Sequence, residues 1–159
     1  MGMLGDFDLR HLITDFGCFH LVMLGVGDGR SPADALRFDF KEILAVEPNH
    51  RRALEVAIRH AAEPRLEVLH ERAEKGLRQA LSQLPPAAPV LFWLALPQLE
   101  SQLRLITGLR QIERDIFIID DLNALEDGCA ETLLGPTHEL QRFSHGSGTL
   151  LALPGRSEP

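Results

Sequence analysis

A glycine-rich turn between a predicted strand and a predicted helix constrains this chain more than any other feature. The apolar run at residues 21–24 has strand character and ends in Gly25-Val26-Gly27-Asp28-Gly29. Ser31 and Pro32 then begin a helical pattern, because serine favours the N-cap and proline the first helical position. A strand, a glycine turn and a helix in this order present backbone N–H groups to a nucleotide-like ligand.

The spacing of these glycines, G-x-G-x-G, argues against two common phosphate-binding motifs. A dinucleotide fingerprint would need a third glycine at position 30, where this chain has Arg30. The P-loop pattern G-x-x-x-x-G-K-[ST] does not occur at the turn either. A NAD-binding oxidoreductase therefore remains only a weak alternative.

The rest of the chain alternates between strand and helix patterns. Residues 90–96 form a continuous apolar run, which is typical of a strand buried on both faces, and Trp93 within it is expected in the core. Alternating strands and helices predict a parallel sheet with right-handed crossovers. The expected strands are 18–24, 42–46, 65–70, 90–96 and 115–119, and the expected helices are 32–41, 50–62, 73–84 and 99–112. In the second helix Leu54, Val56, Ala57 and Ile58 are available for burial.

The two ends of the chain differ from this alternating pattern. Residues 1–17 read as a lead-in with a helical turn near 8–14, and 122–137 as a loop with one helical turn over the carboxyl end of the sheet. Residues 138–144 and 149–153, joined by a turn at 146–148, predict an antiparallel hairpin at the sheet edge. The expected fold is α/β: a Rossmann-like three-layer sandwich in one domain, residues 1–159.

The composition argues against several classes of partner. The chain has 159 residues and a formal net charge of −7, so non-specific binding to nucleic acid or to an anionic membrane is not expected. A local basic patch stays open, since arginines cluster at 51, 52 and 59 and again at 104, 110 and 114. Cys18 and Cys129 form no C-x-x-C pair, and no apolar run approaches the roughly 20 residues of a membrane span. A cytoplasmic location with reduced cysteines is the expectation.

The glycine turn, the parallel strands and the terminal hairpin together resemble the class I S-adenosylmethionine-dependent methyltransferases, over roughly residues 18–154. The resemblance implies that the turn wraps the methionine part of S-adenosylmethionine and that an acidic residue ending the second strand binds the ribose. It also implies that residues after the third strand contact adenine and that the segment after the fourth lines the mouth of the site. The corresponding residues are Gly25, Val26, Gly27 and Gly29 for methionine, Glu47 and Pro48 for ribose, Glu71, Arg72 and Ala73 for adenine, and Ala95 at the mouth.

Within that family, the residues around Trp93 and the run ending in Asp120-Asp121 are similar to small-molecule O-methyltransferase-like members. Asp120 and Asp121 are the candidate catalytic groups, either as a base or to orient the acceptor. Mg²⁺ is left open as a second cofactor, because those relatives often carry acidic residues at the end of the fourth strand as well. This chain has Ala95-Leu96-Pro97 there, and adjacent carboxylates on an extended chain point in different directions.

Two functions follow from the resemblance. The first is an S-adenosylmethionine-dependent methyltransferase acting on a small-molecule acceptor. The second is a methyltransferase-like binding or interaction module without catalysis. Met23 favours the second, since many relatives carry an acidic residue two positions before the first glycine. A homodimer is an open alternative to a monomer for either function.

Overall fold

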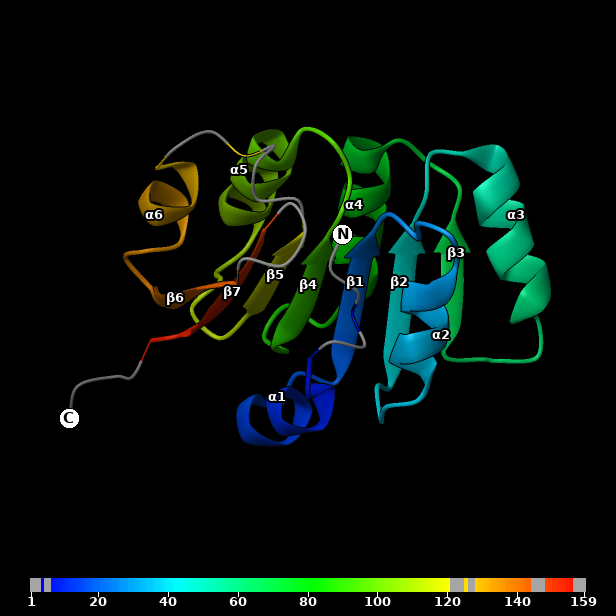
Figure 1. Cartoon of the computed structure of the whole chain (residues 1–159), viewed down its shortest axis with the longest axis horizontal. Helices are drawn as coiled ribbons and strands as arrows, with labels where there is room; N and C mark the ends of the chain where they lie inside the picture. The colour runs from blue at the N-terminus through cyan, green and yellow to red at the C-terminus, as the bar shows by residue number, and fades with distance from the viewer. Residues whose placement is uncertain (1–3, 5–6, 121–124, 126–127, 144–147, 156–159) are drawn as a thin grey trace.

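A seven-stranded sheet with helices on both faces forms the molecule (Figure 1). The computed structural model describes residues 4, 7–120, 125, 128–143 and 148–155. Helices span α1 Leu9–Phe16, α2 Arg30–Leu36, α3 His50–Arg59, α4 Ala73–Gln83, α5 Leu99–Leu109 and α6 Cys129–Leu133. Strands span β1 His20–Leu24, β2 Glu42–Val46, β3 Leu66–Leu69, β4 Val90–Leu94, β5 Ile116–Asp120, β6 His138–Phe143 and β7 Thr149–Pro154.

The order of the strands across the sheet is β3-β2-β1-β4-β5-β7-β6. Strands β1 to β5 pair in parallel, β7 pairs antiparallel with β5, and β6 pairs antiparallel with β7. The predicted parallel sheet and its C-terminal hairpin are therefore confirmed. Because the first five strands run the same way, their carboxyl ends meet at one edge, where α/β sheets place ligand sites.

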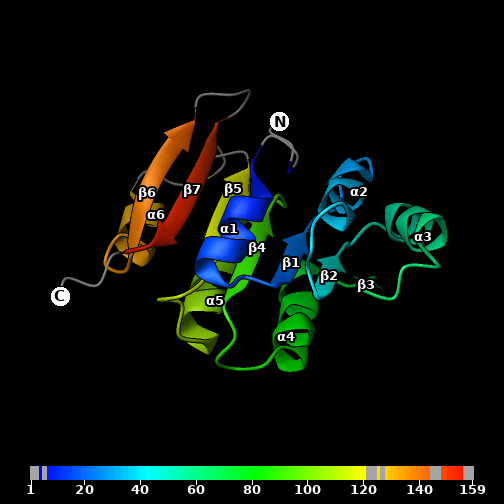
Figure 2. The same ribbon diagram turned by 90° about the horizontal axis from the view of Figure 1, so that it is seen from below.

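Two apolar layers hold the helices against the sheet. Val22 and Leu24 of β1 pack in the layer under α4, α5 and α6, whereas Leu21 and Met23 pack in the layer under α1, α2 and α3 (Figures 1 and 2). This alternation follows from the two-residue period of a strand. Trp93 is buried beside Met23, as the apolar run around it predicts. Position 23 therefore belongs to the core.

Helix α2 begins and ends earlier than the sequence pattern predicts. Gly29, in the left-handed region at φ 90°, is the N-cap, and the Asp28 carboxylate accepts a hydrogen bond from the N–H of Arg30 at 3.1 Å. The prediction that Ser31 caps this helix is wrong, because Ser31 lies inside it. At the other end, Arg65 donates to the carbonyl oxygens of Leu36 and Phe38, both at 2.8 Å. These bonds come from a distant segment, so a local pattern could not predict where the helix ends.

Helix α3 buries fewer of its apolar residues than expected. Ala53 and Val56 face the sheet, but Leu54 is 50% exposed and Ile58 is 67% exposed, and Ala57 is exposed as well. The helix contacts β3 at the edge of the sheet, so only one narrow face finds a partner. Among the residues that the structure describes, no helix is long and apolar enough to cross a membrane.

Candidate functional site

Three strand ends converge below the glycine turn. The backbone pairing continues past the strands: the N–H of Gly25 donates to Val46 at 2.9 Å, and the N–H of Ala95 donates to Leu24 at 2.9 Å. The N–H of Glu47 donates to Leu69 at 3.0 Å. The turn, the Glu47 loop and the segment after β4 therefore share one framework at the carboxyl edge of the sheet.

The glycines of the turn share a backbone conformation but differ in what surrounds them. Gly25, Gly27 and Gly29 have φ of 96°, 56° and 90°, in the left-handed region that side chains disfavour. A Cβ at Gly27 would meet nothing within 4 Å, so the backbone there is open to an approaching ligand. A Cβ at Gly25 would lie 3.0 Å from Cδ2 of Leu96, so that side chain covers the first glycine. Val26 is buried between them, and its N–H is bonded to Glu47.

Glu47 lies where the ribose-binding residue is expected, but its carboxylate is already engaged. Its Oε2 accepts a hydrogen bond from the N–H of Val26 at 3.0 Å, and its Oε1 accepts one from the N–H of Asn49 at 2.9 Å. The residue is only 2% exposed. The carboxylate thereby ties the glycine turn to the loop after β2. Each oxygen keeps a second lone pair, so its chemistry still suits a pair of hydroxyl groups once it becomes accessible.

The residues that follow the ends of β2 and β3 differ in their exposure. Pro48 is exposed, Glu71 pairs with Lys75 at 2.8 Å, and Arg72 is the N-cap of α4 without a side-chain capping bond. Gly76 lies one turn further along α4, where a Cβ would come within 2.3 Å of Cγ1 of Val46. This close contact sets the start of α4 directly against the end of β2.

Ala73, the first residue of α4, opens onto a pocket of about 410 Å³ between α4 and α5. The α5 side of this pocket was not predicted from the sequence. The signal was available, since Gln102 takes a buried position among the apolar residues that make α5 a core helix, Leu99, Leu103 and Ile106. Besides Ala73 the lining consists of Glu74, Gln98, Ser101, Gln102, Arg104 and Leu105.

The predicted catalytic pair is only partly within the described residues. Asp120 ends β5, is 2% exposed and pairs in the ladder with Thr149 of β7. Asp121 lies outside the residues that the structure describes. Within those residues, no three His, Cys, Asp or Glu side chains come together as a metal site. The side chain at the end of β4 is Ala95, which contributes no ligand.

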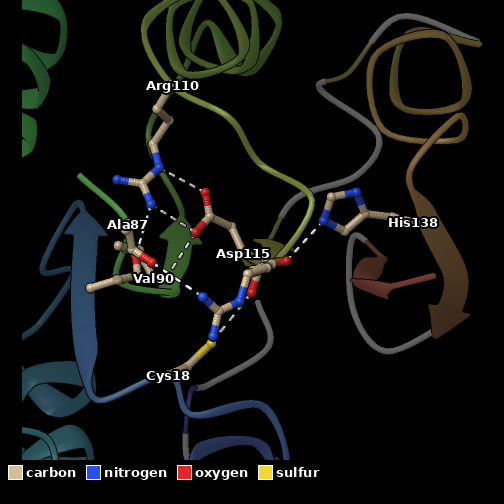
Figure 3. A network of polar contacts seen from close by, with 8 residues as sticks. Cys18, Ala87, Val90, Arg110, Asp115 and His138 are labelled. Carbon is tan, nitrogen blue, oxygen red and sulfur yellow. Dashed lines mark hydrogen bonds and ion pairs between the residues drawn. The ribbon is translucent and has the colours of Figure 1, made fainter. Parts of the chain in front are cut away.

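A second polar cluster lies at the opposite, amino end of the sheet (Figure 3). Asp115, just before β5, accepts hydrogen bonds from Arg110 at 2.8 and 3.0 Å and from the N–H of Val90 at 2.9 Å. Nε2 of His138 lies 2.8 Å from the carbonyl oxygen of Asp115, so this ring nitrogen carries the proton. The cluster joins β4, β5 and β6, and its groups are satisfied by protein partners.

Burial dominates the electrostatics of that cluster. Burial raises the pKa of Asp115 above its ordinary value, and Arg110 opposes this effect. Burial, with a further contribution from Asp115, raises the pKa of the nearby Cys18 thiol to about 12. Both groups are held by structural contacts far from the glycine turn, so neither belongs to the candidate site.

The strand order and the antiparallel hairpin define the fold of class I methyltransferases. Solved structures with this fold match most of the chain. An O-methyltransferase from Bacillus cereus in complex with SAH has a TM-score of 0.70 at 15% identity, covering 95% of this chain and 80% of that one. A methyltransferase from Geobacter sulfurreducens has a TM-score of 0.70 at 13% identity, covering 97% and 80%.

A third structure, an SAH-bound methyltransferase from Podospora anserina, has a TM-score of 0.64 at 14% identity and covers 93% of this chain and 76% of that one. No protein-family model matches the sequence, and no curated protein matches it. At these identities the likeness is one of fold. The chain is therefore similar in fold to these methyltransferases, and its own activity is a separate question.

Proposed function

We propose that this protein is an S-adenosylmethionine-dependent methyltransferase that acts on a small-molecule acceptor. One juxtaposition carries the proposal: a glycine turn that is open at Gly27, a carboxylate at the end of β2 and a pocket beside the start of α4 lie along one edge of the sheet. Gln102 lines this pocket, and its buried Oε1 has no hydrogen-bond partner in the structure. A glycine turn, a carboxylate and an adjoining pocket in this order suit a cofactor that carries an amino acid, a ribose and a base.

The roles of the cofactor-binding residues follow from their chemistry. Gly25, Val26, Gly27 and Gly29 would hold the methionine end through their backbone, and Glu47 with Pro48 would hold the ribose. Adenine would lie against Glu71, Arg72 and Ala73, and Ala95 would border the mouth. The bound cofactor supplies an electrophilic methyl group on a sulfonium.

The acceptor would lie near the end of β5. Asp120 and Asp121 are the proposed groups for orienting it there and for taking a proton when the acceptor is a hydroxyl. The methyl group on the sulfonium is already a strong electrophile, so the proposed transfer does not require Mg²⁺. Cytoplasmic location, one domain and a homodimer remain predictions that the fold does not test.

Calorimetric titration with S-adenosylmethionine and S-adenosylhomocysteine (SAH), with and without Mg²⁺, tests the cofactor site. We expect micromolar binding, which Glu47→Ala should weaken at least about tenfold through loss of the hydroxyl hydrogen bonds. Glu67→Ala, which removes an exposed carboxylate from β3, is the matched control and should bind like the wild type. Equal binding by the Glu47 variant would exclude the ribose role, and no binding at millimolar ligand would reject the proposal.

A methyltransferase-like module without catalysis is the second candidate, and a specific observation favours it. Both oxygens of Glu47 are occupied by backbone N–H groups, and Leu96 covers Gly25. Such contacts would make the turn a self-sufficient structural connection. Binding of neither ligand by the intact protein would support this second function.

A further inference from the structure

Helix α3 presents apolar side chains to solvent at the edge of the molecule. Leu54, Ala57 and Ile58 are exposed, and we call these three residues the α3 patch. Leu54 and Ile58 are four residues apart, so they adjoin on one side of the helix, whereas Ala53 and Val56 face the sheet. Figures 1 and 2 show α3 at the outer end of the sheet, beside β3. Adjoining exposed apolar side chains are a feature of interaction surfaces.

The charges beside the α3 patch are positive and partly unpaired. Arg52 and Arg59 are exposed, and they are seven residues apart, about two helical turns, so they lie on the same side of α3. Arg51 pairs with Glu55 at 2.9 Å, but neither Arg52 nor Arg59 forms an ion pair within the part of the chain that the structure describes. The whole chain has a net charge of −7, so a positive surface on α3 is a local exception.

The position of these arginines on the helix is unfavourable for the isolated protein. Arg51 and Arg52 belong to the first turn of α3, which contains no acidic residue. The unpaired N–H groups of a helix N-terminus carry partial positive charge and favour acidic side chains there. Glu55 offsets this effect for Arg51, but no described acidic side chain offsets it for Arg52. Residues that oppose a local rule without a compensating contact are typical of functional surfaces.

The charge of this surface decides between its possible occupants. Two copies of the chain that met through the α3 patch would bring Arg52 and Arg59 of both copies together, and like charges across an interface are unfavourable. An anionic membrane or a nucleic acid would also meet the net negative charge of the rest of the chain. An acidic amphipathic helix avoids both costs, because its apolar face matches the α3 patch and its carboxylates match the free arginines.

We propose that the solvent face of α3 is a docking surface for an acidic amphipathic helix of a partner protein. The apolar face of that helix packs on Leu54, Ala57 and Ile58, and its carboxylates pair with Arg52 and Arg59. This inference is independent of the proposed function, since it uses none of the residues assigned to the cofactor or to the acceptor.

Fluorescence anisotropy with two labelled synthetic peptides tests the proposal. The first peptide is a helix with leucine along one face and glutamate on its flanks, and its twin has lysine in place of glutamate. The wild type should bind the glutamate peptide at least about tenfold more tightly than the lysine twin, because the twin places like charges opposite Arg52 and Arg59. Ile58→Asn should weaken binding of the glutamate peptide at least about tenfold, since it removes an apolar contact from the centre of the surface. Leu109→Asn changes an exposed leucine of α5 and is the matched control, which should bind like the wild type.

Four results would overturn the docking surface. The first is equal affinity of the wild type for the two peptides, or no binding of the glutamate peptide at submillimolar protein. The second is an equal loss in Ile58→Asn and Leu109→Asn, since binding would then not depend on α3. Co-sedimentation with phosphatidylserine vesicles that Ile58→Asn abolishes would make a lipid surface the occupant. A dimer in light scattering that Ile58→Asn abolishes would make a second copy the occupant. The wild-type comparison of the two peptides needs no variant, and thermal unfolding verifies that each variant is folded.

Discussion

Glu47 has a structural task in the ligand-free protein as well as a proposed binding role. Its carboxylate accepts one N–H from the glycine turn and one from the loop after β2, and burial removes competing water. Charge-assisted hydrogen bonds of this kind are stronger than neutral ones. A ligand that bonds to the Glu47 carboxylate would use the lone pairs that these two N–H groups leave free.

Glu47→Gln should destabilise the free protein by about 2 kcal/mol, because one buried backbone N–H would face an amide nitrogen in place of an oxygen. Urea unfolding measures this change. Glu67→Gln on the exposed side of β3 should change the free energy of unfolding by less than about 0.5 kcal/mol. Equal, small effects in both variants would show that the bonds of Glu47 contribute nothing to stability.

The thiol of Cys18 should be unreactive in the folded protein. Its pKa of about 12 leaves almost no thiolate at pH 8, and the thiolate is the nucleophile in alkylation. Because the folded value lies above the unfolded value of 9.0, deprotonation favours the unfolded chain as pH rises toward 12. Alkylation by iodoacetamide, located by peptide mass spectrometry, should occur at this residue only with unfolding. Rapid labelling at pH 8 in native conditions would contradict the burial of this thiol.

The positions of the helices depend on a few close contacts with strands. Helix α4 approaches β2 so closely that Gly76 has no room for a side chain, whereas Gly108 in α5 faces open space. Arg65 ends α2 in a comparable way, through carbonyl oxygens that local sequence does not select. The contact of Gly76 with Val46 places the start of α4 beside the end of β2.

The two glycines make a matched pair of tests for this packing. Gly76→Ala should destabilise the protein by about 2 kcal/mol, because its Cβ would lie 2.3 Å from Cγ1 of Val46. Gly108→Ala should stabilise it by about 0.5–1 kcal/mol, because alanine is the better helix former and meets nothing within 4 Å. Chemical denaturation measures both changes. A stabilising Gly76→Ala would show that α4 can move away from β2.

The two ends of the sheet have different chemistry. At the amino end, Asp115 pairs with Arg110, and the ring of His138 bonds to the backbone of Asp115 and to the hydroxyl of Thr137 (Figure 3). At the carboxyl end, the buried Oε1 of Gln102 has no hydrogen-bond partner and the backbone of Gly27 is open. The buried ion pair of Asp115 and Arg110 therefore stabilises the amino end of the sheet, and the proposed ligand site lies at the carboxyl end.

Arg110→Met should destabilise the molecule by about 3 kcal/mol at pH 7, because it leaves the buried carboxylate of Asp115 without its cation. Burial already raises the pKa of Asp115 and Arg110 opposes this, so the variant raises that pKa further. Folding then favours the protonated acid, and the destabilisation should shrink as pH falls below the raised value. Urea unfolding across a pH series measures this dependence.

Glu131→Gln breaks the half-exposed pair with Arg142 and is the control for Arg110→Met. An exposed ion pair contributes little, so this variant should lose less than about 1 kcal/mol at any pH. A loss in Arg110→Met that is constant with pH would show that Asp115 stays ionised throughout.

Much of this architecture could be predicted from local patterns. The glycine turn, the acidic residue after β2 and the buried run of β4 depend on residues close together in the chain, and backbone conformation and two-residue periodicity act at that range. The order of elements was predictable for the same reason. The direction of the sheet then places the turn and Glu47 at one edge.

Other features were decided by contacts between segments far apart. Burial of Glu47 against the turn, the end of α2 at Arg65, exposure of Leu54 and Ile58, and the unpaired oxygen of Gln102 all depend on which elements pack together. A side chain's burial and hydrogen bonds are properties of the assembled layers, and no local pattern encodes them. The sequence therefore determines where the proposed ligand site lies, and the packing of the helices on the sheet decides which groups are exposed there.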